Sequence, residues 1–116
     1  TVMSDSLFCK IIAGQIPGPF VHEDHEIVAI RDINPQAPLH VLIVPRRHIA
    51  TLNDLTTHDD ALVGAMQRVA GAIAKDHGYA DEGYRTVFNT QRAAGQTVFH
   101  IHLHLLAGRT LTWPPG

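Results

Sequence analysis

Three histidines stand at every second position of one short stretch, His100-Ile101-His102-Leu103-His104-Leu105-Leu106. In an extended strand, successive side chains point to opposite faces, so the three imidazoles share one face and the aliphatic side chains share the other. The aliphatic face can pack on a core. Three titratable rings in a row have no packing role of this kind, so the row predicts a chemical one.

Three explanations of the row are open. The first is a polar sheet face exposed to water, because polar and apolar residues commonly alternate on half-exposed strands. The second is a metal site, because imidazole is a common zinc ligand. Residues two apart in a strand are separated by roughly 6.7 Å, so His100 and His104 lie about 13 Å apart at their backbones. One ion would reach all three rings only under strain, which disfavours a metal ion at the row itself.

The third explanation is an anion site for phosphoryl or nucleotidyl transfer. One neutral ring nitrogen can attack phosphorus while a neighbouring ring donates to the phosphate oxygens. Because imidazole titrates near neutrality, it can be a nucleophile in one step and carry a proton in another. The preceding loop adds Gly95, which permits close backbone approach, and the neutral donors Gln96 and Thr97. Asp32 has the chemistry to hold a ribose diol, although a loop aspartate more often forms a turn or a cap.

Hydrophobic spacing predicts the elements that position these residues. A short helix is predicted over 7–13, and a long one between a cap at Thr57 and a stop at Gly78. The apolar positions of the long helix, at spacings of four, three and four, are Leu62, Met66, Val69 and Ile73. Strands are predicted over 20–23, 27–30, 40–45, 85–89 and 98–106. Since strands precede and follow one long helix, we predict an α+β fold with a mainly antiparallel five-stranded sheet.

Composition bounds the class of protein. The chain has 116 residues, 45% hydrophobic and 17% charged, which fits a single domain over 1–116 with one core. No apolar run of about 18 residues is present, so we expect no membrane association. Nine Lys+Arg against eleven Asp+Glu give a net charge of -2, which argues against a nucleic-acid partner. A single cysteine, Cys9, and the lack of a signal-like N-terminal pattern lead us to expect a cytoplasmic location.

The histidine row and its surroundings resemble the histidine triad (HIT) family, whose motif is H-φ-H-φ-H-φ-φ with φ hydrophobic. Further matches to its Hint branch, the histidine triad nucleotide-binding proteins, run in order along nearly the whole chain. They are Phe8-Cys9-Lys10-Ile11-Ile12 with Ile16-Pro17, Asp32-Ile33-Asn34-Pro35-Gln36-Ala37-Pro38, Pro45-Arg46-Arg47-His48-Ile49, Gly83-Tyr84-Arg85, Gly95-Gln96-Thr97-Val98 and Trp113-Pro114-Pro115-Gly116. The three histidines alone would be moderately specific, whereas the combined pattern is highly specific.

The resemblance implies a fold, an activity and a set of residue roles. Members of this branch are homodimers with an extended sheet that bind purine nucleotides. They hydrolyse nucleoside phosphoramidates through a nucleotidyl-histidine intermediate. By this resemblance His102 is the nucleophile and His104 is the phosphate contact that assists proton transfer, while His100 and His40 orient the row.

The resemblance also implies a nucleotide pocket. Its members would be Asp32 at the ribose, Gln96 and Thr97 at the phosphate, Asn89, Gly95 and Val98 beside them, and Phe8, Ile11, Ile30, Ile33 and Leu42 around the base. On pattern alone, Ile11, Ile30 and Leu42 would look the same if they were only core residues.

The resemblance also indicates where a metal ion would bind, which is at the first histidine of the row and not at its centre. Relatives with zinc carry C-x-x-C near the N-terminus, a histidine after the third strand and the first triad histidine. The matching positions here are Ser6, Cys9, His48 and His100. A structural zinc ion normally has four good ligands, and serine replaces one of them. We therefore expect no metal and no required cofactor, with a partial or water-completed zinc site as the alternative.

The leading functional prediction is a purine nucleoside phosphoramidase that hydrolyses the P–N bond of AMP- or GMP-linked amines. A dinucleoside polyphosphate hydrolase, as in another branch of the family, is the second possibility. A nucleotide-binding interaction protein with incidental turnover is the third. The Trp-Pro-Pro-Gly end and Gly95-Gln96-Thr97 favour the Hint branch over the second.

Overall fold

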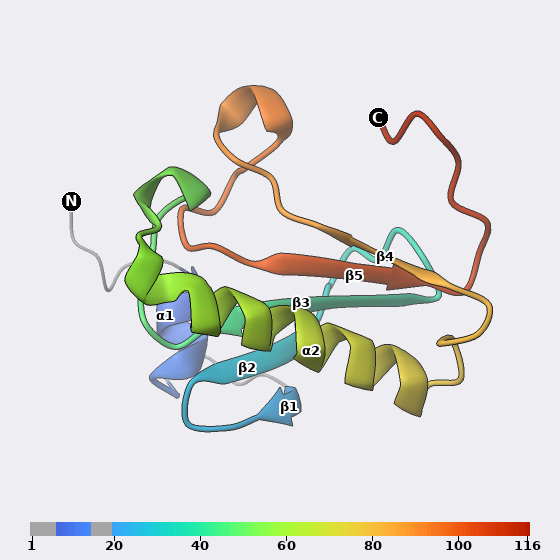
Figure 1. Cartoon of the computed structure of the whole chain (residues 1–116), viewed down its shortest axis with the longest axis horizontal. Helices are drawn as coiled ribbons and strands as arrows, with labels where there is room; N and C mark the ends of the chain where they lie inside the picture. Colours follow the sequence, from blue (N-terminus) through green and yellow to red (C-terminus); the bar gives the residue numbers. More distant parts are fainter. Residues whose placement is uncertain (1–6, 15–19) are drawn as a thin grey trace.

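Five strands form one antiparallel sheet in the order β1-β2-β3-β5-β4 (Figure 1). The computed structural model describes residues 7–14 and 20–116. Its helices and strands are α1 (Leu7–Ile12), β1 (Phe20–Glu23), β2 (Ile27–Arg31), β3 (Leu39–Pro45), α2 (Asp60–Asp76), β4 (Tyr84–Val87) and β5 (Leu103–Ala107). Single 3-10 turns are η2 (Leu52–Asp54), η3 (Thr57–Asp59) and η4 (Arg92–Ala94). The predicted α+β class and five-stranded sheet are confirmed.

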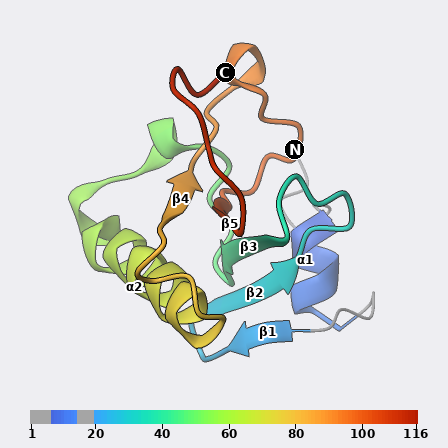
Figure 2. The ribbon, with the colours of Figure 1, turned by 90° about the vertical axis from the view of Figure 1, so that its right-hand side faces the viewer.

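The two faces of the sheet are covered differently. Figure 2 shows α2 on one face and α1 on the other. The α2 face holds the main core, which includes Val41, Ile43, Leu103 and Leu105 from the strands and Met66, Ala70 and Ile73 from the helix. On the other face, α1 packs over Val28, Ile30, Leu42 and Val44. None of the helices in the described ranges is long and apolar enough to cross a membrane.

Strand register places the histidines on the α1 face. Residues directly opposite each other in antiparallel strands share a face. Leu42 of β3 stands opposite His104, and His40 stands opposite Leu106. Since Leu42 belongs to the cluster under α1, His104 and His40 lie on the same face, beyond the part that this cluster occupies. The sheet thus keeps one continuous hydrophobic core behind a face that carries polar rings.

The last strand is shorter than predicted. The sequence predicts a strand over 98–106, whereas β5 begins at Leu103. The Ile101 N–H donates to the Ile49 carbonyl at 2.7 Å, so the chain before β5 pairs with the segment that follows β3. The alternation survives this departure from the sheet, because Ile101, Leu103 and Leu105 are all buried. Two of the three histidines therefore precede the strand.

The long helix starts three residues after its predicted cap. Thr57 lies inside η3, and α2 begins at Asp60. Thr56 caps the turn η3, since its hydroxyl accepts the His58 N–H and the Asp59 carboxylate accepts the Thr56 N–H. The residue directly before α2, Asp59, makes no side-chain capping bond to the helix. This reciprocal capping box therefore fixes the 3-10 turn that leads into α2. The helix ends at Asp76, two residues before the predicted stop at Gly78.

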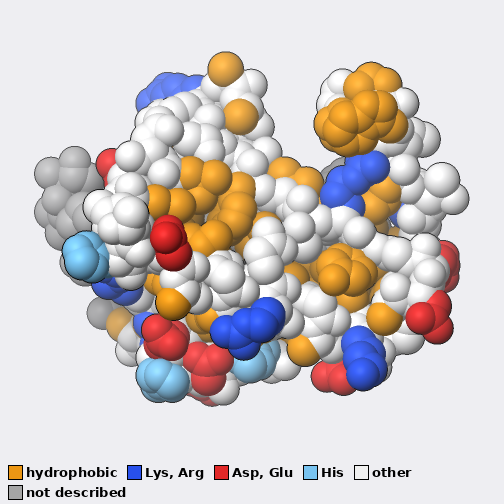
Figure 3. Space-filling view, in the orientation of Figure 1, with side chains coloured by type: hydrophobic (Ala, Val, Ile, Leu, Met, Phe, Trp, Pro, Cys, Tyr) orange, Lys and Arg blue, Asp and Glu red, His pale blue; other side chains and the backbone are white. Residues whose placement is uncertain are grey.

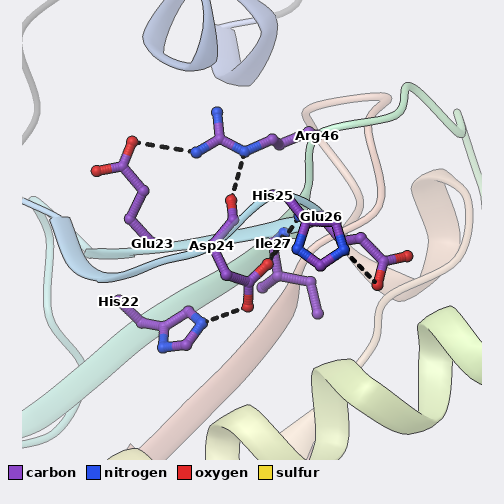
Figure 4. Close-up of polar contacts among 7 residues, drawn as sticks. All are labelled: His22, Glu23, Asp24, His25, Glu26, Ile27 and Arg46. Carbon is purple, nitrogen blue, oxygen red and sulfur yellow. Dashed lines mark hydrogen bonds and ion pairs between the residues drawn. The ribbon is translucent and has the colours of Figure 1, made fainter.

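The turn between β1 and β2 is organised by one carboxylate (Figure 4). Asp24 accepts the backbone N–H groups of Glu26 and Ile27 at 2.7 and 2.8 Å. It also contacts His22 at 2.6 Å, and the Asp24 carbonyl accepts a bond from Arg46. The hydrogen bond from His22, aided by the two backbone bonds, lowers the pKa of Asp24 to about 2. The charged carboxylate therefore holds the turn over a wide pH range.

Replacing Asp24 with alanine is expected to lower the free energy of unfolding by about 1–2 kcal/mol, because two backbone donors and one imidazole lose their acceptor. Urea denaturation followed by circular dichroism measures this. Asp81→Ala removes an exposed carboxylate and is the matched control, with an expected change within about 0.5 kcal/mol. Equal effects of the two substitutions would contradict this account of the turn.

Candidate active site

His102 presents a lone pair on one defined nitrogen. Its Nδ1 lies 2.8 Å from the His100 carbonyl oxygen. A carbonyl can only accept, so Nδ1 carries the proton of the neutral ring and Nε2 is left unprotonated. Burial lowers the pKa of His102, although the hydrogen bond to His100 and the charge of Asp32 act in the opposite direction. The neutral form therefore dominates at neutral pH, and Nε2 is available as a nucleophile.

His104 and His40 form a second defined pair. His40 Nε2 lies 2.9 Å from His104 Nδ1, and the Gln36 N–H donates to His40 Nδ1 at 3.0 Å. Because a backbone N–H can only donate, neutral His40 carries its proton on Nε2 and donates it to His104. Neutral His104 then carries its own proton on Nε2. With ring centres 5.1 Å apart, His102 supplies a lone pair and His104 an adjacent N–H donor.

His100 links the row to a cluster of ligand atoms. Its ring is fully buried, and Nε2 donates to the Pro45 carbonyl at 2.8 Å. Its Nδ1 therefore faces Cys9 Sγ at 3.4 Å with a lone pair, and Cys9 Sγ lies 3.3 Å from His48 Nδ1. One thiol and two imidazoles are a donor set that fits zinc, and these residues would hold it. The fourth position of the predicted set, Ser6, lies outside the described residues.

A second group of possible ligands lies at the other end of the row. Asp32, His40 and His104 offer atoms within 4.8 Å of one another. A metal ion needs an unprotonated nitrogen, but the Gln36 N–H places the proton of His40 on Nε2, the atom that faces the group. The arrangement suits a donor chain better than a metal ion, and Asp32 Oδ2, 3.4 Å from His40 Nε2, sits where it stabilises that proton.

The apolar residues predicted around the base gather in one cluster. Phe8, Ile11, Ile30 and Leu42 pack together with Val28 and Val44, and Val98 packs against them. Each of the four predicted residues in this cluster is 9% exposed or less, so the cluster forms a packed layer between α1 and the sheet. Phe8 joins this layer to the histidines, since its ring centre lies 4.9 Å from that of His102. Ile33 is separate from the layer and is 99% exposed.

The loop before the row is held by a buried amide. The Gln96 side chain accepts the Gln91 N–H and donates to the carbonyls of Ala50 and Val98. Both of its N–H groups are thus used inside the protein, and this side chain shapes the loop instead of facing a ligand. Thr97 beside it is exposed.

Two other predicted pocket residues, Asn89 and Gly95, precede Gln96 in the chain. Gly95 is exposed at the end of η4. Asn89, with Leu106, lines a hollow of about 400 Å³ beside the C-terminal segment. Figure 3 shows a notch between that segment and the loop that carries η4. Both residues therefore lie in the surroundings of the histidine row. In the described part of the chain, neither one makes a hydrogen bond to a histidine ring of the row.

Comparison with known proteins decides the family. A family model described as scavenger mRNA decapping enzyme C-term binding matches residues 5–111. The crystal structure of a HIT family hydrolase from Legionella pneumophila superposes with a TM-score of 0.95 and 52% identity, covering 97% of this chain and 100% of that one. The chain belongs to the histidine triad family. Like its neighbours in that family, it is a hydrolase.

Two curated histidine triad relatives refine the placement. An uncharacterized HIT-like protein of Synechococcus elongatus is 50% identical over 97% of both chains. The purine nucleoside phosphoramidase of Escherichia coli K12 is 47% identical over 92% of this chain and 90% of its own length. The predicted Hint-type membership is thus confirmed.

Two participants in this histidine triad site were missed by sequence reasoning. Gln36 contributes its backbone N–H, and Pro45 contributes its carbonyl. Neither contribution depends on the side chain, so residue type carries no signal for it. Only the proline-flanked loop around Gln36 and the strand end at Pro45 indicate that these backbones are fixed.

Acid is expected to weaken the histidine triad fold through His104. Burial, followed by the nearby imidazoles, lowers the pKa of His104 from 6.5 to about 4. Between these values the unfolded chain binds more protons than the folded one, so stability falls as pH falls from about 6.5 to about 4. His104→Gln should show a shallower decline over this window, measured by urea denaturation at a series of pH values. His58→Gln changes an exposed ring and should keep the wild-type slope; parallel curves for wild type and His104→Gln would refute the expectation.

Proposed function

We propose that the protein is a purine nucleoside phosphoramidase that cleaves the P–N bond of AMP- or GMP-linked amines. The observation that carries the proposal is the complementary protonation of neighbouring rings, a lone pair on His102 Nε2 beside an N–H on His104 Nε2. The 47% identity to the Escherichia coli phosphoramidase supports the same substrate class.

The reaction runs in two balanced steps. His102 Nε2 attacks phosphorus, the P–N bond of the substrate breaks, and the leaving nitrogen takes the proton from His104 Nε2. This gives a free amine, a nucleotidyl group on a His102 ring that is now positively charged, and a negatively charged His104 ring that accepts the N–H of His40. Water then attacks the same phosphorus, its proton passes to His104, and the nucleoside monophosphate leaves as His102 regains its lone pair. Each ring returns to its starting protonation state.

The two steps also explain why neutral rings matter. A protonated His102 has no lone pair for attack, and burial keeps its pKa low. We propose that Asp32 holds the ribose hydroxyls and that the layer around Phe8 borders the base. We further propose that the reaction requires no metal ion, since nucleophile and proton donor are both side chains of the row. Activity that persists after chelation is the expected result, and its loss with recovery on added zinc would contradict this.

Trapping the intermediate tests the function directly. Adenosine 5′-phosphoramidate is mixed with enzyme, quenched in alkali within one turnover, digested and analysed by mass spectrometry. We expect an adenylyl group on His102. An adenylyl group on another residue, or turnover without an adduct on any residue, would reject the proposal.

The alternative hydrolase is separated by substrate preference. We expect kcat/KM for adenosine phosphoramidate to exceed that for diadenosine triphosphate by at least about 100-fold, a difference of roughly 3 kcal/mol in transition-state stabilisation. The reverse order would favour a dinucleoside polyphosphate hydrolase.

We also propose a homodimer, acting in the cytoplasm, with the second copy at β4. Within the described chain, β4 pairs only with β5 and forms one edge of the sheet. An uncovered edge strand has unpaired backbone groups, and exposed Tyr84 begins this one. A second β4 would extend the sheet across the interface. Light scattering at micromolar concentration should give the mass of two chains, and a monomer would refute this arrangement.

A further inference from the structure

The loop that carries Asp32 is fastened from the far end of β5. The Arg109 Nε donates to the Gln36 carbonyl at 2.8 Å, across 73 positions of sequence. The N–H of the same residue, Gln36, donates to His40 Nδ1. We propose that Arg109 is a positioning residue, which holds the Gln36 backbone so that its N–H fixes the proton of His40 on Nε2 and thereby the proton of His104 on Nε2.

The contacts form a donor chain with one direction. A guanidinium and a backbone N–H can only donate, so the direction of the hydrogen bonds from Arg109 and from the Gln36 N–H is fixed. His40 must then donate to His104, and the N–H of His104 is left for the substrate. The carboxylate of Asp32, near His40 Nε2, favours the same placement of the proton.

The loop depends on contacts from outside itself. Asn34, Pro35 and Gln36 are exposed, and the Gln36 side chain bonds only to the Asn34 carbonyl within the loop. Two residues that follow β5 hold the loop. Arg109 bonds to the Gln36 carbonyl. Gly108 packs so closely on Pro38 that a Cβ placed on this glycine would lie 2.8 Å from it. Without Arg109, water competes for the exposed Gln36 peptide, and its N–H no longer stays aligned on the His40 ring.

A released His40 can carry its proton on Nδ1. Its Nε2 then accepts from His104 Nδ1, and His104 presents a lone pair where it previously presented an N–H. In the proposed reaction the leaving amine would lose its proton donor. This last consequence rests on the proposed function, whereas the protonation of the two rings does not.

The proposal is tested by nitrogen-15 NMR of the histidine rings at pH 7.5, because the two nitrogens of a neutral imidazole give widely separated signals. Wild type should show protonated Nε2 on His40 and His104. In Arg109→Ala, the share of Nδ1-protonated His104 should rise about threefold to tenfold, the equilibrium factor of one net hydrogen bond. Unchanged nitrogen signals in a folded Arg109→Ala protein would overturn the proposal, whatever its activity.

Two controls separate position from charge and from side-chain identity. Arg68→Ala removes a positive charge from an exposed position of α2 and should leave the ring signals unchanged. Gln36→Ala removes the side chain but keeps the backbone, so it should also be silent. If Arg109→Ala does not fold, Arg109→Met, which keeps a long side chain but has no N–H donor, should show the same change. Wild-type signals in a folded Arg109→Met protein would then overturn the proposal.

Kinetics test the link to catalysis separately. With adenosine phosphoramidate, Arg109→Ala should lower kcat about threefold to tenfold with little change in KM, because the lost donor acts in the transition state. Altered ring signals with unchanged kcat would overturn this link. Absence of any phosphoramidase activity in wild type would instead reject the proposed function, and the NMR result would still decide the role of Arg109.

Discussion

His102→Ala is expected to lower kcat for adenosine phosphoramidate by at least about 1,000-fold, because removal of a catalytic nucleophile has effects of this size or larger. No other ring can take its place. His104 Nδ1 is committed to His40, its Nε2 carries a proton, and His100 Nε2 is bonded to a backbone carbonyl. The loss should appear in kcat and in the nucleotidyl intermediate together.

The same variant separates an enzyme from a binding module. His102→Ala should still bind AMP within about tenfold of wild type, about 1.4 kcal/mol, because the ring acts mainly on the reacting phosphorus. Calorimetry measures this affinity. His25→Ala, at an 88% exposed side chain in the β1–β2 turn, is the matched control and should be fully active. Residual activity of His102→Ala within tenfold of wild type would exclude His102 as nucleophile.

Gly108→Ala is expected to give a large loss of stability, about 2–4 kcal/mol. Its φ is +99°, and an added Cβ would lie 2.8 Å from Pro38 Cβ and 3.0 Å from the Tyr79 hydroxyl. A side chain here meets both an unfavourable backbone conformation and a crowded site, and each costs about 1–2 kcal/mol. The ring of Pro38 cannot rotate away, so the end of β5 and the loop over 32–38 must separate.

A second glycine isolates the crowding. Gly78, at φ +83°, has nothing within 4 Å of an added Cβ, so Gly78→Ala carries only the conformational cost of about 1 kcal/mol. Thermal and urea unfolding of both variants measure the difference. Equal losses would mean that the contact with Pro38 relaxes freely. Activity should fall in Gly108→Ala alone, since only that change displaces the loop beside His40.

The sequence predicts most of the framework because its patterns are periodic. Apolar spacing identified α2 and every strand, with errors at the ends. The error at β5 is informative, because alternation continues through Ile101 even though its N–H bonds to Ile49 instead of a strand. Side-chain alternation reports which face is buried. It does not report whether the backbone pairs in a sheet. Residue types alone therefore cannot distinguish a strand of the sheet from an extended segment that buries one face outside it.

For the candidate site, too, the sequence predicts some features and not others. The row itself and its alignment are visible in the sequence, since they follow from residue type and spacing. The protonation of each ring is not visible, because it is set by partners such as the His100 carbonyl and the Gln36 N–H. Gln96 shows the converse, a polar residue whose type suggested a ligand contact but whose bonds lie inside the loop.

The burial of Ile101, Leu103 and Leu105 has a kinetic consequence for the site. The histidines alternate with residues of the main core, so the backbone that carries the rings cannot shift without opening that core. Amide hydrogens along this stretch should exchange only by global unfolding, while those of the exposed loops exchange by small local fluctuations. We therefore expect the reacting atoms to stand on a slowly exchanging part of the molecule, and adaptation to different leaving amines to fall to the loops around them.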